Sequence, residues 1–278
     1  MTKKATGNIF VNTRAHISLM GCKIDNLSLQ QTLDTIAGFV RTGQPHQHVA
    51  VNVDKLVKAS RDPELRRIIN ACDLVSADGM PVVWASRLLG RPLKERVAGI
   101  DLFDALMERA ASEGWRVFLL GAREDIVRRV AQMYSSHHPR LIVAGVRNGY
   151  WQGDDEAAQV AREIRASRAD LLFVAISSPQ KEQFLGKYLA EMGVPFAMGV
   201  GGSFDVAAGH IKRAPQWMRR SGLEWFYRFL QEPRRMARRY FIDDVAFLWL
   251  FVKEVVNNVK MANNRKVVKS KNVKKSGK

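Results

Sequence analysis

Short apolar segments, rich in β-branched and aromatic residues, recur along the first 200 residues and alternate with stretches of helical character. Five of them are His48–Val53, Trp115–Leu120, Leu141–Val146, Asp170–Ile176 and Pro195–Val200. Buried parallel strands tend to be this continuously apolar. The regular alternation predicts an α/β fold built on a doubly wound, Rossmann-like, mostly parallel sheet.

Helix-start signals lie between these segments. Ser28–Gln31 and Asp101–Asp104 each pair a capping residue with a polar third residue, and Pro63 follows Asp62 at a first helical position. We therefore expect helices to begin near these three points, with Asp101 acting as a cap.

Positive charge is concentrated at the C-terminal end of the chain. Residues 212–278 contain 18 Lys/Arg and 5 Asp/Glu, and so carry +13 of the total charge of +17. We expect an α/β core at 1–210, a helical basic and aromatic appendage at 211–259, and a polybasic, disordered tail at 260–278. Such an appendage would bind something negative, and nucleic acid and anionic lipid are the two candidates.

The longest apolar run near this end is Val245–Val252, which is far shorter than the ~20 residues of a membrane-spanning helix. Its aromatic and leucine-rich character suits a helix lying at the membrane interface, and packing on its own domain or on another subunit is an equal alternative. Lys260–Lys278 has eight Lys/Arg and no acidic residue, which favours attraction to an anionic leaflet over a purely solubilising tail.

Two features point to the cytoplasm. Cys22 and Cys72 have neither disulfide-framework nor zinc-site spacing, and no apolar segment of signal-peptide length follows the lysines near the N-terminus. We therefore expect a cytoplasmic protein that is peripheral on the inner face of the membrane.

In doubly wound sheets, ligands bind beyond the carboxyl ends of the strands. Three segments follow predicted strands directly, namely Asn52, Ser177–Glu182 and Gly201–Asp205. The glycine turn allows backbone N–H groups to approach a phosphate, and Asp205 is placed to hold a ribose hydroxyl. The alternative is that Gly201 and Gly202 only permit a tight turn, because no complete GxGxxG or GxxxxGK[ST] motif is present.

Asp78 and Arg96 are the candidate catalytic residues. Asp78 lies just before a helix that Pro81 can open, and an ionised carboxylate there can accept a proton from an attacking hydroxyl. The planar guanidinium of Arg96, in a connecting loop, can clamp a diphosphate. An ordinary Asp-Gly turn and a solvated surface arginine are the structural alternatives.

The sequence does not favour a metal site. His46 and His48 could face one side of a strand, but no third ligand follows at a telling spacing. Asp154–Glu156 suits a helix start, and no Asp-x-Asp follows a strand to hold a divalent cation. We expect no cofactor and no metal, with arginines and helix ends neutralising any bound phosphate.

Several separate motifs together resemble the WecG/TagA/CpsF family of bacterial glycosyltransferases, from about Gly21 to Tyr240. They are Asn52, Ala77–Gly79, Glu95–Asp101, Pro179 with Glu182, Gly199–Asp205, Arg213–Pro215, Gly222–Arg228 and Glu232–Arg235. The resemblance implies an inverting transfer of a sugar from a UDP donor to a polyprenyl-diphosphate-linked saccharide, without an essential metal. The sugars used by such relatives include N-acetylmannosamine, its uronic acid and glucose.

The resemblance also implies roles for individual residues. Asp78 resembles the catalytic base and Arg96 a residue on the reacting sugar or the diphosphate. The implied donor-binding residues are Asn52, Gln180, Gly201, Gly202 and Asp205, and the implied acceptor-diphosphate-binding residues are Arg228, Arg235 and Arg238. The three arginines would complete the site when the appendage folds onto the core at the anionic inner leaflet.

The chain departs from the family pattern at two places. Many relatives have Pro-Lys-Gln-Glu where this chain has Pro179-Gln-Lys-Glu182, so Gln180, Lys181 or neither contacts the substrate. Many also carry threonine near Asn52, where Ala50 and Val51 stand. The identity of the donor sugar is left open by these differences.

Two other function classes share some of these sequence features. A nucleic-acid-binding protein would share the basic surface but needs neither a glycine turn nor an Asp-Gly site, so nucleic acid is not an expected partner. An NAD-dependent dehydrogenase would need the GxGxxG fingerprint that this chain lacks. A homo-oligomer is compatible with the sequence.

Overall fold

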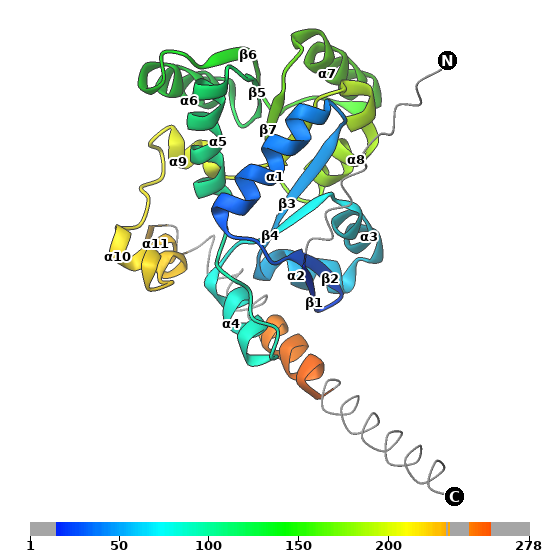
Figure 1. Ribbon diagram of the computed structural model, residues 1–278, viewed down its shortest axis with the longest axis vertical. Helices are drawn as coiled ribbons and strands as arrows, with labels where there is room; N and C mark the ends of the chain where they lie inside the picture. Colours follow the sequence, from blue (N-terminus) through cyan, green and yellow to red (C-terminus); the bar gives the residue numbers. More distant parts are fainter. Residues whose placement is uncertain (1–14, 232, 234–244, 257–278) are drawn as a thin grey trace, which may run out of the picture.

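The computed structural model describes residues 15–231, 233 and 245–256 (Figure 1). At its centre lies a six-stranded sheet in which every pairing is parallel. In spatial order the strands are β4 (Leu74–Ala77), β3 (His46–Val51), β8 (Phe196–Gly199), β7 (Leu171–Ala175), β5 (Arg116–Gly121) and β6 (Ile142–Arg147). The predicted doubly wound, mostly parallel sheet is therefore confirmed.

All five predicted strands are present, with ends shifted by one or two residues. The edge strand β4 was not predicted. A separate antiparallel hairpin of β1 (His16–Leu19) and β2 (Cys22–Asp25) was also missed. This hairpin extends the fold beside β4, where the Asp25 carboxylate accepts a hydrogen bond of 2.8 Å from the Val75 backbone N–H.

Helices cover both faces of the sheet (Figure 1). One face packs against α1 (Leu29–Thr42), α5 (Gly99–Glu113), α6 (Glu124–His137) and α9 (Ser203–Ala207). The other packs against α2 (Val53–Arg61), α3 (Pro63–Ala71), α7 (Gly153–Ser167) and α8 (Gln180–Met192). Leu171 and Phe173 belong to the first core and Leu172 and Val174 to the second, because side chains along a strand alternate between faces.

Two of the three predicted helix starts are confirmed. Ser28 caps α1 in a capping box with Gln31, and the Asp62 side chain caps α3, whose first residue is Pro63. Asp101, however, is not a cap. Helix α5 begins at Gly99, three residues earlier than a cap at Asp101 predicts, so Asp101 lies in the first turn and its carboxylate is available to neighbouring arginines.

The C-terminal helices lie at one end of the sheet, next to α4 (Met80–Leu88). These are α10 (Gln216–Arg220), α11 (Glu224–Gln231) and a helical segment at 245–256. Between α10 and α11, Gly222 lies so close to α4 that an added Cβ would come within 2.7 Å of the Met80 Cγ atom. This close approach fixes α11 against the N-terminal end of α4.

The helical segment 245–256 packs against the molecule with one face. Phe247, Leu250 and Phe251 join the core formed by α2, α3 and α4. The Glu254 carboxylate accepts hydrogen bonds from the Met20 backbone N–H, at 3.0 Å, and from Arg91, at 3.3 Å. Packing on its own domain, one of the two alternatives for this apolar run, is therefore observed for this face.

Within the described part of the chain, no helix is both long and apolar enough to cross a lipid bilayer. The predicted tail at 260–278 lies outside the described residues. The proposed division at residues 210 and 259 stays a prediction.

Phe103 joins several elements of the first core. Its ring is fully buried on α5 and contacts Phe173 on β7 at 4.7 Å, Tyr134 on α6 at 5.2 Å and Phe204 on α9 at 5.7 Å between ring centroids. We expect Phe103→Ala to lower the free energy of unfolding by about 3–5 kcal/mol, because it leaves a cavity that this rigid junction cannot fill.

Urea denaturation followed by circular dichroism measures this change. The matched control is Tyr150→Ala, which removes an aromatic ring that is 68% exposed and should change the free energy of unfolding by less than about 0.5 kcal/mol. Equal effects of the two substitutions would contradict the assignment of Phe103 to the core junction.

Candidate active site

The candidate residues that follow β3, β4 and β8 lie at the same edge of the sheet, beyond the carboxyl ends of the strands. Asn52 follows β3, Asp78 follows β4, and Gly201 follows β8. The neighbouring strands β3 and β8 continue into helices on opposite faces, α2 and α9. In open α/β sheets this divergence creates the crevice in which ligands bind.

Asp78 is held between the sheet and a loop. Its backbone N–H donates to the Val51 carbonyl oxygen at 2.8 Å, and the next connection returns to the same edge because the Val97 N–H donates to the Ala77 carbonyl oxygen at 2.9 Å. Gly99 lies beside the carboxylate, since an added Cβ there would be 3.9 Å from Asp78 Oδ2. Asp78 thus stands at the N-terminal end of α4, as predicted.

Burial is the main cause that raises the pKa of Asp78 above its ordinary value of 3.8. The positive charge of Arg96 opposes this change, whereas the negative charges of Glu224 and Asp101 add to it. A carboxylate with a raised pKa is a stronger base than an exposed one, which suits a group that must accept a proton.

Arg96 is clamped by two carboxylates. Its guanidinium donates to Glu224 of α11 at 2.8 Å and to Asp101 of α5 at 3.3 Å, and only 15% of the side chain is exposed. Burial alone would lower the pKa of Arg96, but the hydrogen bond and charge of Glu224, with those of Asp78 and Asp101, raise it overall. The structure therefore brings Arg96 close enough to Asp78 for each charge to act on the pKa of the other, and their catalytic roles stay predictions.

A second arginine extends this ionic cluster. Arg213 donates to Asp101 and, at 3.2 Å, to Asp104. Asp104 also accepts a hydrogen bond from the Tyr134 hydroxyl. This cluster links the start of α5 to the segment that leads into the C-terminal helices.

Sequence reasoning did not assign roles to Glu224, Arg213 or Asp101 in this cluster. All three lie within the motifs that carry the family resemblance, Gly222–Arg228, Arg213–Pro215 and Glu95–Asp101. Their position within these motifs was the one sequence signal that could have pointed to them. Their pairing depends on segments up to 128 residues apart in the chain, so spacing along the sequence could not reveal it.

The glycine turn after β8 has the expected shape. The Ser203 N–H donates to the Val200 carbonyl oxygen at 3.1 Å, and Gly201 at the first central position has a φ of 53°. Gly202 leads into the short helix α9, on which Asp205 is half-buried. The turn opens at the same edge as Asp78, but the roles of Gly201, Gly202 and Asp205 in donor binding stay predictions.

Asn52 and Gln180 occupy different settings. The Asn52 side-chain oxygen accepts a hydrogen bond of 3.0 Å from the Lys55 backbone N–H and so caps α2. The side-chain NH2 group of Asn52 is therefore the part that could bind a nucleotide-sugar donor. Gln180 is exposed at the start of α8, whereas the next residue, Lys181, is buried. Of the two residues that differ from the family pattern, Lys181 is therefore the one directed into the protein.

Of the three predicted tail arginines, the structure describes only the backbone of Arg228. Arg228 lies on α11, the helix that reaches the site through Glu224, but its side chain lies outside the described atoms. Arg235 and Arg238 lie outside the described residues. Their proposed contact with an acceptor diphosphate stays a prediction.

The histidines of β3 have structural roles. His46 stacks on Phe39 and lies 3.2 Å from the Asp73 carboxylate, while His48 hydrogen bonds to Ser76 at 2.9 Å. Burial lowers the pKa of His48 to about 3, so its imidazole is neutral. Among the residues that the structure describes, no group of three or more potential ligands is arranged to hold a metal ion.

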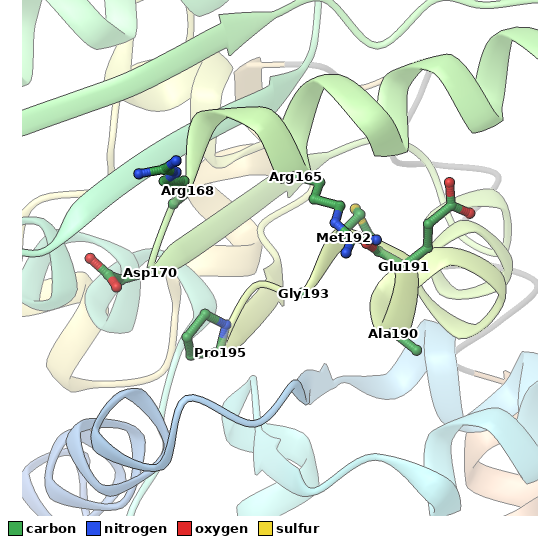
Figure 2. A pocket seen from close by; sticks show the side chains of 9 residues that line it. Arg165, Arg168, Asp170, Ala190, Glu191, Met192, Gly193 and Pro195 are labelled. Atoms are coloured by element: carbon green, nitrogen blue, oxygen red, sulfur yellow. The ribbon is translucent and has the colours of Figure 1, made fainter.

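A hollow of about 390 Å³ lies at the opposite edge of the sheet (Figure 2). It is lined by the ends of α7 and α8 and by the residues that precede β7 and β8, among them Arg165, Arg168, Asp170 and Pro195. The Asp170 carboxylate is already bonded to the Arg116 backbone N–H at 2.7 Å. Because this hollow is at the amino ends of the strands, it is separate from the site of Asp78 and Arg96.

Comparison with known proteins shows the family of this chain. The sequence profile of the glycosyl transferase WecG/TagA/CpsF family matches residues 17–260. The chain is 36% identical over 196 residues to an N-acetylglucosaminyldiphosphoundecaprenol N-acetyl-beta-D-mannosaminyltransferase of Bacillus subtilis (strain 168), with 70% of this chain and 75% of the relative covered. It is 37% identical over 190 residues to the enzyme of the same name from Bacillus spizizenii, with 68% and 73% covered.

The match spans the α/β core and the helices that contribute Glu224 to the site. On this extent of similarity, the chain belongs to the WecG/TagA/CpsF family of glycosyltransferases and is a hexosyltransferase.

Proposed function

We propose that this enzyme transfers a sugar of the N-acetylmannosamine, N-acetylmannosaminuronic acid or glucose type from a UDP donor to a polyprenyl-diphosphate-linked saccharide in the biosynthesis of a bacterial cell-surface polysaccharide. The observation that carries the proposal is the position of Asp78. Its partly buried carboxylate lies beside Arg96, at the sheet edge where the Gly201–Gly202 turn opens. Among these sugars, the names of the two Bacillus relatives favour N-acetylmannosamine.

The proposed chemistry is a single displacement with inversion. The acceptor hydroxyl oxygen attacks the anomeric carbon, and Asp78 takes the hydroxyl proton. The bond between that carbon and the diphosphate oxygen breaks, and UDP leaves. Negative charge grows on the departing diphosphate, so preorganised donors such as the Arg96 guanidinium and the backbone N–H groups of the glycine turn lower the barrier most.

The proposed setting is the inner leaflet of the cytoplasmic membrane. The face of segment 245–256 that points away from the core carries a row of exposed apolar residues, Val245, Leu248, Trp249, Val252 and Val256. Because the opposite face is anchored on the core, this row has a fixed orientation. An apolar row at helical spacing next to a basic sequence is typical of a helix that lies at headgroup level.

The proposed reaction is tested by mass spectrometry of lipid-linked products formed from a panel of UDP-sugars. We expect the wild type to extend a polyprenyl-diphosphate-linked N-acetylglucosamine acceptor by one hexosyl unit. Asp78→Asn should lower turnover at least about 100-fold, because the amide cannot accept the hydroxyl proton. UDP affinity should stay within about twofold of the wild type, since the substitution preserves size.

Asp154→Asn is the matched control, because Asp154 is an exposed aspartate on α7 that pairs with Lys187. It should turn over at the wild-type rate. Near-normal turnover by Asp78→Asn would contradict the assignment of the base, and no product from any UDP-sugar would contradict the proposed function.

Glu224 is expected to set the pH at which Asp78 works. A base acts in its deprotonated form, so kcat/KM should fall as the pH drops through the raised pKa of Asp78. Glu224→Gln removes a negative charge that raises this pKa, and the acid limb of the profile should therefore move to lower pH.

The measurement is kcat/KM as a function of pH at constant ionic strength. Glu113→Gln serves as the control, since Glu113 lies in the last turn of α5 and pairs with Arg109 away from the site. An acid limb that stays in place, or moves to higher pH, would show that Glu224 does not act on Asp78.

Membrane attachment is tested by sedimentation with liposomes containing an anionic phospholipid. Trp249 is 63% exposed, and Trp249→Glu should weaken liposome binding about tenfold or more, because it replaces a large apolar surface by a charge. Tyr150→Glu is the control and should bind like the wild type, because Tyr150 follows β6, which lies at the opposite end of the strand order from β4. Equal binding by both variants would contradict the proposed surface.

A further inference from the structure

Three charged side chains are buried together beneath the glycine turn. Lys55 of α2 is 6% exposed, Lys181 of α8 is 7% exposed, and Glu182 of α8 is 1% exposed. The Glu182 Oε1 atom lies 2.9 Å from the Lys55 Nζ atom and 3.6 Å from the Lys181 Nζ atom. Two ammonium groups therefore share one carboxylate, and the group of three carries one positive charge in excess.

Lys181 runs along the strand end that leads into the turn. A Cβ added to Gly199 would meet the Lys181 Cε atom at 2.5 Å and its Cδ atom at 2.7 Å, so any other residue at this position would force the lysine to shift. A Cβ added to Gly201 would lie 4.0 Å from the Lys181 Nζ atom. The ammonium group of Lys181 therefore lies next to the turn after β8.

An excess buried charge is costly unless a counter-ion approaches it. Burial is the main cause that lowers the pKa of Lys181 to about 8, and the repulsion of Lys55 adds to it while Glu182 opposes it. The charge of the Glu182 carboxylate is neutralised mainly by Lys55, which is the nearer of the two lysines. The second ammonium is left next to a turn whose backbone also suits an anion.

We propose that Lys181, rather than Gln180, binds an anionic group of the nucleotide-sugar donor at the Val200–Ser203 turn and so helps to select the donor. This inference rests on the proposed function. A diphosphate and a sugar carboxylate would both satisfy the ammonium, and the proximity of Gly201 favours the diphosphate. Lys181 would then neutralise charge on the leaving group, in addition to the guanidinium of Arg96.

The test is calorimetric binding of UDP, uridine, a UDP-N-acetylhexosamine, whose sugar is uncharged, and a UDP-hexuronic acid to the full chain. Two variants, Lys181→Gln and Lys181→Met, leave the Lys55–Glu182 pair intact. Lys187→Gln is the matched control, because Lys187 lies on the same helix but is exposed and pairs with Asp154 at 2.8 Å. All variants are first compared with the wild type by thermal unfolding.

If Lys181 binds the diphosphate, both Lys181 variants should weaken UDP binding about tenfold or more and leave uridine binding unchanged, as the loss of a charge-assisted hydrogen bond predicts. Wild-type affinity for UDP should fall as the pH rises through about 8, where the Lys181 ammonium loses its proton, and the variants should not show this fall. If it binds a sugar carboxylate, only the affinity for the UDP-hexuronic acid should drop.

A purely structural role for Lys181 predicts the reverse pattern, with lower Tm and unchanged affinities in both variants. That result, or unchanged affinities at wild-type Tm, would overturn the inference while wild-type product formation upholds the proposed function. A wild type that binds none of the uridine nucleotides would overturn both.

Discussion

The site depends on the ion pair between Arg96 and Glu224. This 2.8 Å contact joins the loop between α4 and α5 to α11, across 128 residues of chain, and it lies beside the base candidate Asp78. A guanidinium that is mostly buried must be neutralised, and two carboxylates from different elements do so. Helix α11 is therefore part of the candidate site, because its Glu224 carboxylate pairs with Arg96 and contributes to the electrostatics around Asp78.

At two places in this crevice, clustered charges of one sign help to shift the pKa of a buried group, and the two shifts have opposite directions. Around Arg96, carboxylates are in excess, and the charges of Glu224 and Asp101 add to burial, the main cause that raises the pKa of Asp78. Around Glu182, ammonium groups are in excess, and the repulsion of Lys55 adds to burial, the main cause that lowers the pKa of Lys181. One sheet edge thus has an acidic cluster at β4 and a basic cluster between β3 and β8. In the proposed reaction the proton is taken beside the acidic cluster, and the basic cluster would add to Arg96 in neutralising the departing diphosphate.

Much of the architecture could be predicted because it follows from local patterns. Continuous apolar runs identified five strands, and the rule that ligands bind beyond carboxyl ends placed Asn52, Ser177–Glu182 and Gly201–Asp205 on one edge. Asp78 was singled out instead by its position before a helix that Pro81 can open. Strand β4 was missed because it has only four residues, Leu74–Ala77, and one of them is serine. The start of α5 was misplaced because Asp101 has the chemistry of a cap, whereas Ala98 holds that position without a side-chain hydrogen bond. Long-range pairs such as Arg96 with Glu224 leave no spacing signal at all.

The hydrogen bond from Met20 to Glu254 has a consequence for how the protein is made. The two residues are separated by 234 positions, and Met20 lies in the turn of the β1–β2 hairpin, so this contact joins the helix that carries Glu254 to the hairpin. Since synthesis proceeds from the N-terminus, this helix leaves the ribosome after all the residues of the surface on which it docks. Its exposed apolar row, Val245 to Val256, takes a defined orientation only once these distant parts of the chain have come together.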